Sequence, residues 1–220
     1  MPRPRDQRAR RESLRDAALR VLIERGVAST RLKDIAAEAG LNPATVLYYF
    51  PSITELQLDV LRRAMDLFYE RRREATSGIQ DARERLLAIV QAGLPSDATD
   101  DIARLAWETI PFELRNPALA EFDRLYVQRQ VDLYVAALEL GAAQRHFTLV
   151  RDVRAIATNL LALEDYHGLR VLLGWTSAAE ALDLVVDYAS LATSCDLAAQ
   201  LRAGADPQSP VLLDATDAAG

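Results

Sequence analysis

The sequence predicts an all-α protein, with a small three-helix head at the N-terminus and a larger helical body after it. Apolar residues recur at three- and four-residue spacing along most of the 220 residues, which is the period of an amphipathic helix. Short groups of Gly, Pro and Asn interrupt this pattern where helices are expected to begin or end. No alternating apolar run bounded by a tight turn occurs, so no β-hairpin is expected.

The first helix is expected over residues 11–25. One face of this segment is apolar, formed by Leu14, Ala17, Ala18, Val21 and Leu22. Gly26 follows and is expected to end the helix, because glycine adopts the left-handed conformation that terminates helices.

Three further helix starts fall within residues 30–56. Ser29 or Thr30 is expected to cap the first of these helices with its hydroxyl oxygen, and Gly40 is expected to end it. Asn42 and Pro43 then supply an N-cap and a first-turn proline, so another helix begins at once.

Ser52 starts the next helix, which leaves the middle one only about two turns long. Two short helices joined by a Gly-containing turn are typical of a helix-turn-helix. In that motif the second helix lies in the major groove of DNA. The sequence therefore predicts a DNA-binding head over residues 10–53.

Residues 36–52 read Ala-Ala-Glu-Ala-Gly-Leu-Asn-Pro-Ala-Thr-Val-Leu-Tyr-Tyr-Phe-Pro-Ser. This segment closely resembles the signature of the tetracycline-repressor (TetR) family, and the preceding helix fits the same pattern. The resemblance is specific over roughly residues 10–60. Over the rest of the chain it is one of length and helical character.

Carried over by position, the resemblance implies DNA contacts from Lys33, Asn42, Pro43, Ala44, Thr45, Tyr48 and Tyr49. Lys33 and Pro43 are expected at base edges, and the hydroxyl-bearing side chains near phosphates or bases. Two positions depart from the family. Ile53 stands where a phosphate-binding lysine is usual, and Leu47 stands where a tyrosine is usual. Both departures remove contacts to the DNA backbone that are usual in the family.

The N-terminal residues 1–9 are expected to form a basic, flexible arm that includes Arg3 and Arg5. Residues 1–50 carry a net charge of +4, whereas the remaining 170 residues carry −10. Arginine-rich arms bind phosphates and enter the minor groove, so the arm is expected to contact DNA beside the head. The alternative is a solvated terminus that binds nothing.

The body is expected to span residues 54–202. Its helices are expected at about 54–77, 81–93, 97–115, 117–140, 151–173 and 177–200. Residues 203–220 are mostly small and polar and are expected to be disordered. The last two helices resemble the dimerisation helices of TetR-family members. We therefore expect a homodimer, although the same helices would also serve to close the core of a monomer.

The body also holds most of the aromatic residues, together with acidic residues in an otherwise apolar segment. The candidate effector-binding residues are Trp107, Phe112, Phe122, Tyr126, Glu164, Asp165, Tyr166 and His167. Buried carboxylates are costly without partners, and an aromatic cage with a carboxylate attracts a cation. A cationic or aromatic small-molecule effector is the resulting hypothesis. The simpler alternative is that Arg154 or Arg170 pairs with these acids.

Other classes of protein are disfavoured. The two histidines have neither metal-ligand spacing nor a nucleophilic serine nearby, and no phosphate-binding glycine loop occurs, so no enzyme, metal or cofactor is expected. The single cysteine, Cys195, excludes an internal disulfide and suits the cytoplasm. No apolar run approaches the length of a membrane span. RNA is disfavoured because its major groove is too narrow for side-chain readout.

The predicted function is that of a repressor that binds a near-palindromic, double-stranded DNA operator as a dimer and is released by a small-molecule effector. The alternative is a dimeric DNA-binding regulator controlled by a protein partner, without a small-molecule pocket. Activation in place of repression also stays open at this point.

Overall fold

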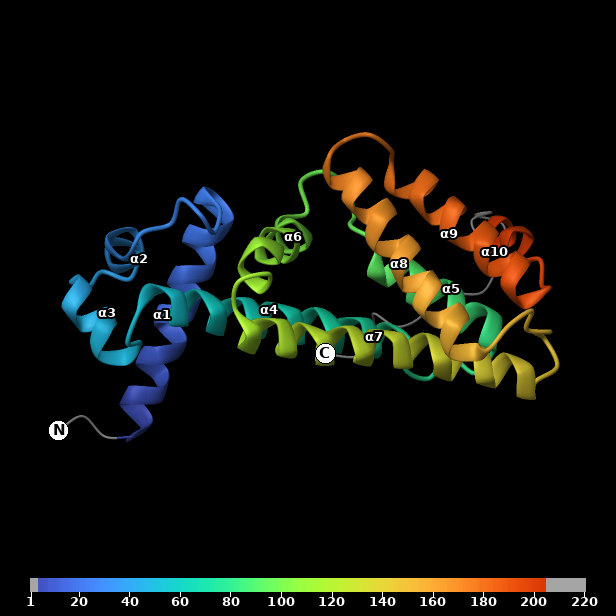
Figure 1. Cartoon of the computed structure of the whole chain (residues 1–220), viewed down its shortest axis with the longest axis horizontal. Coiled ribbons are helices and arrows are strands. Elements are labelled where there is room, and N and C mark those ends of the chain that lie inside the picture. Colours follow the sequence, from blue (N-terminus) through green and yellow to red (C-terminus); the bar gives the residue numbers. More distant parts are fainter. Residues whose placement is uncertain (1–3, 205–220) are drawn as a thin grey trace, which may run out of the picture.

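The computed structural model describes residues 4–204, apart from the side chains of residues 4–6, 113, 118, 203 and 204. The described residues form helices without strands (Figure 1). The helices are α1 (Pro4–Arg25), α2 (Leu32–Glu38), α3 (Pro43–Tyr49), α4 (Ile53–Ala75), α5 (Ala82–Gly93), α6 (Asp101–Glu113), α7 (Pro117–Ala143), α8 (Val153–Leu172), α9 (Ala178–Thr193) and α10 (Leu197–Gly204). The predicted all-α architecture of head and body is confirmed.

The head consists of α1, α2, α3 and the first turns of α4, which together enclose one apolar cluster. Asn42 caps α3 by accepting a hydrogen bond from the Thr45 backbone N–H, and Ser52 caps α4 in the same way from Glu55. The predicted starts of both helices are therefore confirmed. Gly26 and Gly40 both have positive φ angles, as their expected places at helix ends require.

The predicted cap of α2 is wrong. Neither Ser29 nor Thr30 caps it, because Arg31 occupies the flanking position and Thr30 instead donates its hydroxyl to the Gly26 carbonyl oxygen at 2.7 Å. The carboxylate of Asp34 accepts the Arg31 backbone N–H at 3.0 Å. An acidic side chain within the first turn thus replaces the hydroxyl cap.

Two predicted boundaries differ as well. The expected arm over residues 1–9 is helical from Pro4 onward, because α1 continues back to that residue. Arg3 and the side chain of Arg5 lie outside the described residues, as do residues 205–220 of the expected tail. The single helix expected over 177–200 is two helices, since Ser194 ends α9 in the left-handed conformation.

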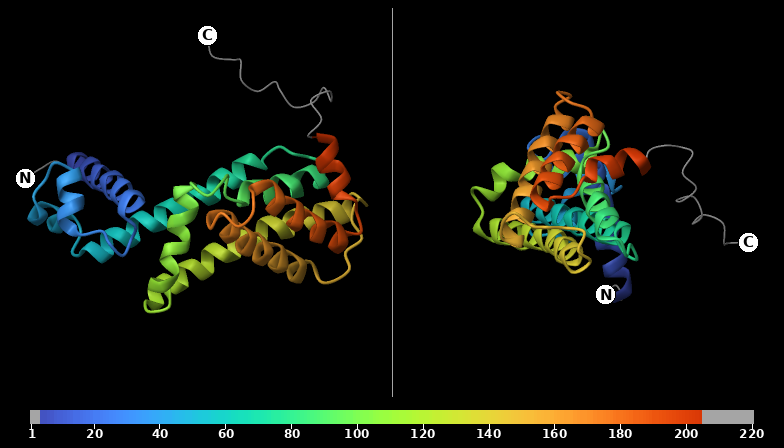
Figure 2. Two further views of the ribbon diagram at one scale, coloured as in Figure 1. Left: turned by 90° about the horizontal axis from the view of Figure 1, so that it is seen from above. Right: turned by 90° about the vertical axis from the view of Figure 1, so that its right-hand side faces the viewer.

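The body packs α5, α7, α8, α9 and α10 around a second, larger apolar cluster. Helices α4 and α7 lie side by side beneath it, and α4 alone runs continuously from the head into the body (Figures 1 and 2). Helix α6 stands between the head and α8, and it contacts α1, α4, α7 and α8 (Figure 1). No helix within residues 4–204 is long and apolar enough to cross a membrane.

Candidate functional site

The outer surface of the head is formed by α3 and the turn before it. Lys33, Pro43 and Ala44 are exposed, and the Tyr48 side chain is 68% exposed. Tyr49 differs, because it is half-buried and packs against the apolar cluster of the head, with its ring edge-on to that of Tyr48 at 5.1 Å. Tyr48 is therefore the aromatic side chain most available to DNA, while Tyr49 also supports α3.

Asn42 and Thr45 form a local pair. The Thr45 hydroxyl donates to Asn42 Oδ1 at 3.0 Å, and the same oxygen accepts the Thr45 backbone N–H at 2.8 Å. Both side chains thus fix the start of α3, and the Thr45 hydroxyl keeps its lone pairs for a further donor.

The two departures from the family pattern have different surroundings. Ile53 packs against the apolar cluster of the head, so it contributes to packing where a lysine would reach a phosphate. Leu47 is 42% exposed on α3 and adds apolar surface to the outer face.

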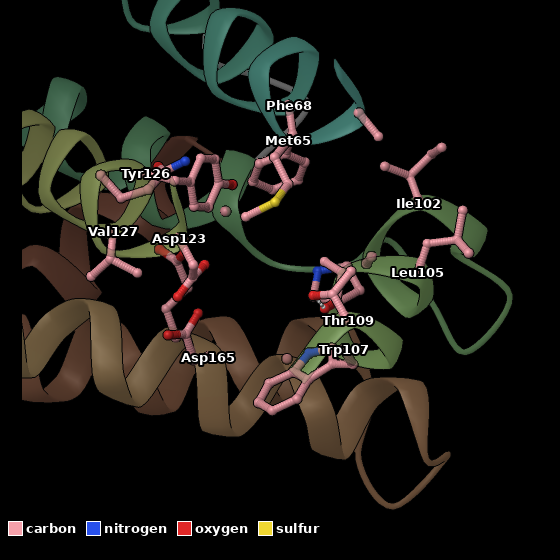
Figure 3. A pocket seen from close by; sticks show the side chains of 18 of the residues that line it. Met65, Phe68, Ile102, Leu105, Trp107, Thr109, Asp123, Tyr126, Val127 and Asp165 are labelled. Carbon is pink, nitrogen blue, oxygen red and sulfur yellow. Dashed lines mark hydrogen bonds between the residues drawn. The ribbon is translucent and has the colours of Figure 1, made fainter. Parts of the chain in front are cut away.

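The body contains a cavity of about 330 Å³ between α4, α6, α7 and α8 (Figure 3). Its apolar wall includes Leu61, Met65 and Phe68 from α4 and Ile102 and Leu105 from α6. Figure 3 shows Tyr126, Asp123 and Asp165 on one side of the cavity and Trp107 facing it from α6. Control by a protein partner without a small-molecule pocket predicts no such cavity, so this alternative is disfavoured.

The eight candidate effector residues divide into two groups. Trp107, Tyr126, Glu164 and Asp165 line the cavity. The other four do not. Phe112 packs against the head cluster, Phe122 lies beneath the guanidinium of Arg62, Tyr166 is largely exposed and His167 contacts Arg170. The effector-binding role of all eight remains a prediction, and four of them lie outside the lining of the cavity.

The cavity is strongly acidic on its α7–α8 side. The Asp165 side chain is exposed to solvent, but protein surrounds its carboxylate closely enough for desolvation to raise its pKa to about 7. Repulsion from Glu164 and Asp123 adds to this rise, and Arg72 opposes it. A cation in the cavity would relieve the repulsion and favour the ionised form of Asp165.

A buried polar network closes the inner end of the cavity. Arg72 from α4 pairs with Glu164 on α8, and their side chains are only 1% and 3% exposed. Arg72 also donates to Gln130 Oε1 at 2.7 Å and to the Ile89 carbonyl oxygen at 3.2 Å, and its guanidinium lies over the ring of Tyr134. The network therefore ties the helix that carries the head to α5, α7 and α8.

Arg72 and Glu164 each shift the pKa of the other. Burial by itself lowers the pKa of Arg72, and the Glu164 carboxylate reverses this effect, so the guanidinium stays charged. Burial raises the pKa of Glu164, while Arg72 and the hydroxyl that Tyr134 donates to Glu164 oppose the rise. The expected pairing of Arg154 or Arg170 with Glu164 is thus wrong, and Arg154 pairs with Asp132.

Sequence reasoning missed two residues of this site. Arg72 follows Leu61, Met65 and Phe68 at steps of four, three and four residues, so its place on the inward face of α4 was visible in the spacing. Asp123 lies one turn before Tyr126 on α7, and the same spacing rule would have found it.

The cavity and the head are in direct contact. Leu61 and Leu105 line the cavity and also belong to the apolar cluster of the head. Glu108, next to Trp107 on α6, accepts the Val27 backbone N–H at 2.8 Å, and Gln57 on α4 donates to the Val27 carbonyl oxygen at 3.0 Å. The segment that joins α1 to α2 is thus held by α4 and α6, which are two of the four helices that line the cavity.

Comparisons with known proteins agree with this architecture. The sequence model described as "Bacterial regulatory proteins, tetR family" matches residues 14–60. The "HTH-type transcriptional regulator BetI" of Agrobacterium fabrum is 36% identical over 110 residues, which cover 49% of this chain and 52% of that protein. The BetI regulator of Brucella canis is 29% identical over 200 residues, which cover 88% of this chain and 96% of that protein.

Solved structures give the same result over most of the chain. A transcriptional regulator from Saccharomonospora viridis, solved in complex with choline, has a TM-score of 0.74 and 29% identity, covering 81% of this chain and 94% of that one. A TetR regulator from Haloarcula marismortui has a TM-score of 0.76 at 20% identity, covering 84% and 98% of the two chains, and so shows the fold alone. The helix-turn-helix head, the helical body and these relatives together show that the chain belongs to the TetR family of DNA-binding, ligand-responsive transcriptional repressors and is not an enzyme.

Proposed function

We propose that the protein is a homodimeric repressor that binds a near-palindromic operator in the cytoplasm and is released by a small organic cation, of which choline is the simplest example. The observation that carries the choice of effector is the pairing of carboxylates with aromatic rings in one cavity. Asp123 and Asp165 stand beside Tyr126, with Trp107 across from them (Figure 3). Aromatic faces and carboxylates are the surroundings that bind quaternary ammonium groups.

The charges of the cavity favour a cation over an anion. One guanidinium, that of Arg72, faces three carboxylates, those of Glu164, Asp123 and Asp165. Glu164 is already paired with Arg72, so the Arg72 charge is offset within the network and Asp165 adds further acidity to the cavity. Two relatives support a cationic effector. One is a solved regulator in complex with choline, and the other is a BetI regulator that aligns over most of the chain.

The homodimer is supported by apolar side chains left uncovered on α8, α9 and the segment between them. Leu173, Trp175, Leu184 and Leu191 are exposed, with values of 50%, 68%, 42% and 75%. Exposed apolar groups favour association, and a second copy would also present the second head that a near-palindromic operator requires. Light scattering of the purified protein tests this proposal, and a monomer at micromolar concentration would contradict it.

In the proposed mechanism the effector acts through the two helices that the cavity shares with the head. A cation bound between α6, α7 and α8 draws the carboxylates together and displaces α6 and α4, which hold the segment before α2 through Glu108 and Gln57. The two heads of a dimer then no longer match the operator. The ligand needs a differential affinity of only about 1–3 kcal/mol between the two states to lower operator occupancy.

The test begins with selection of bound sequences from random duplex DNA by the full-length protein. Choline is then titrated into the complex with the selected operator while fluorescence anisotropy reports bound DNA. We expect release by choline in the wild type and at least tenfold weaker release in Asp165→Asn. Glu139→Gln, which changes an exposed carboxylate of α7 outside the cavity, is the matched control and should behave as wild type. Undiminished occupancy at saturating choline would rule out this effector class.

A further inference from the structure

We propose that the cavity recognises a second group on its ligand besides the positive charge, namely a neutral oxygen acceptor bound by the side-chain amide of Gln130. The inference rests on the proposed function, because it specifies the chemistry of the same ligand. It predicts that the protein distinguishes an amino alcohol or its ether from an alkylammonium ion of equal size.

The orientation of the Gln130 amide is fixed by its neighbour. Arg72 Nη1 donates to Gln130 Oε1 at 2.7 Å. A guanidinium has only donors, so the amide oxygen must face it and the NH₂ group must point the other way. The network therefore presents Gln130 Nε2 as a donor at a defined place.

That donor is buried and lines the cavity. Gln130 is 2% exposed, and its Nε2 makes no hydrogen bond of ordinary geometry among the described residues. The side chain nevertheless lies close enough to Tyr126 to oppose the rise that burial causes in the pKa of that hydroxyl. The Glu164 carboxylate of the same network, in contrast, has hydrogen-bond partners, because it accepts from both Arg72 and Tyr134. A buried donor without an acceptor is costly, and a ligand atom that accepts from it recovers that cost.

The amide lies in line with the cation-binding groups. Asp123, Tyr126 and Gln130 are spaced by three and four residues on α7, so they share one face of the helix. The seven residues from Asp123 to Gln130 correspond to about 10 Å along the helix axis. A ligand whose ammonium group contacts the carboxylates and the Tyr126 ring therefore directs its other end toward Gln130.

The acceptor is expected to be neutral. Glu164 and Asp165 are adjacent on α8, so two carboxylates of one helix stand against the one guanidinium among the described lining residues. A carboxylate on the ligand would be repelled by this excess, whereas a hydroxyl, ether or ester oxygen accepts a hydrogen bond without that penalty. The geometry thus favours choline and its ethers over a zwitterion such as a betaine.

Matched pairs of ligands test this inference on the full-length protein by calorimetry. Choline is compared with propyltrimethylammonium, in which methyl replaces hydroxyl. Choline methyl ether is compared with butyltrimethylammonium, in which CH₂ replaces oxygen. We expect the oxygen-bearing member of each pair to bind about tenfold more tightly, the usual effect of one hydrogen bond to a buried donor. The ether pair isolates an acceptor, because the ether has no O–H to donate.

Gln130→Met should reduce both ratios to about one, because each ratio compares two ligands on the same variant. Gln128→Met, on the exposed side of α7, is the control and should keep the wild-type ratios. Equal binding within both pairs by the wild type, or an unchanged ratio in Gln130→Met, would overturn the inference. If Gln130→Met does not fold, the wild-type ether pair decides by itself. Failure of all four cations to bind would instead contradict the proposed effector class.

Discussion

The head and the cavity use their polar residues in opposite ways. In the head, Asn42, Ser52 and Asp34 each bond to backbone N–H groups within three residues, and side chains such as Tyr48 are left on the outer surface. Around the cavity, Arg72 and Glu164 bond across 92 positions of sequence and are almost wholly buried. The helix starts of the head are therefore specified locally, while the cavity exists only when four helices are assembled.

This contrast predicts that loss of one buried charge damages the whole body. Arg72→Met leaves the Glu164 carboxylate buried without its cation, which should lower the free energy of unfolding by about 3–5 kcal/mol. The control is Arg73→Met, because Arg73 is exposed and its pairing with Glu70 on the same helix contributes little to stability. Denaturant unfolding measures both. Equal stabilities of the two variants would contradict the structural importance of the network.

On the head, by contrast, a side chain is expected to affect function without affecting stability. Tyr48→Ala should weaken operator binding about tenfold, the effect of one lost contact to DNA, and leave thermal unfolding unchanged. Tyr49→Ala should weaken binding and also lower stability, because Tyr49 packs against the head cluster. Anisotropy and calorimetry separate these outcomes, and a stable Tyr48→Ala variant with full affinity would remove Tyr48 from the interface.

The cavity should also make stability depend on pH. The pKa of Asp165, about 7 in the folded protein, exceeds the ordinary value of 3.8, so the folded state holds this proton more strongly than the unfolded chain. The resulting stabilisation is full below about pH 4 and is lost as the pH rises toward 7. Asp165→Asn should therefore match wild type at pH 4 and exceed it by about 1 kcal/mol at pH 8, after allowance for water in the cavity.

Urea unfolding at the two pH values measures this difference. Choline affinity of the wild type should rise over the same interval, because the ionised carboxylate binds the cation. A pH-independent difference between Asp165→Asn and wild type would show that Asp165 is ionised throughout.

The smallest effect is expected where the two regions meet. Glu108→Ala removes the acceptor of the Val27 N–H and should speed exchange of that amide, with a loss of about 0.5–1.5 kcal/mol in local stability. Glu108→Gln keeps an acceptor oxygen and should restore most of the protection. Hydrogen exchange at Val27 measures both, and unchanged protection in Glu108→Ala would separate α6 from the head.

The same difference explains what could be predicted from the sequence. The starts of α3 and α4 depend on Asn42 and Ser52, whose partners lie three residues away, so their signals were visible without a fold. The cap of α2 was mispredicted because the Thr30 hydroxyl donates to the carbonyl oxygen of Gly26, just after α1, and sequence alone does not decide between two local partners.

The cavity could be predicted only in part. The sequence drew attention to Glu164 and Asp165 because carboxylates in an apolar helix need an explanation. It did not reveal that Arg72 pairs with Glu164 while Asp165 lines the cavity, since the contact between Arg72 and Glu164 joins α4 to α8. Arg72 lies in the last turn of α4, where a cation suits the helix end, and its spacing from Phe68 is the signal for the inward face.

Leu61 and Leu105 belong to both regions at once, since each fills the head cluster and lines the cavity. Anyone redesigning this protein as a biosensor for a larger compound would therefore find the two leucine positions closed. Enlarging the cavity at these positions would destabilise the DNA-binding head even without a ligand, and the unliganded sensor would no longer hold its operator. The α7–α8 wall, where Asp123 and Asp165 lie, offers the independent route to new ligand selectivity.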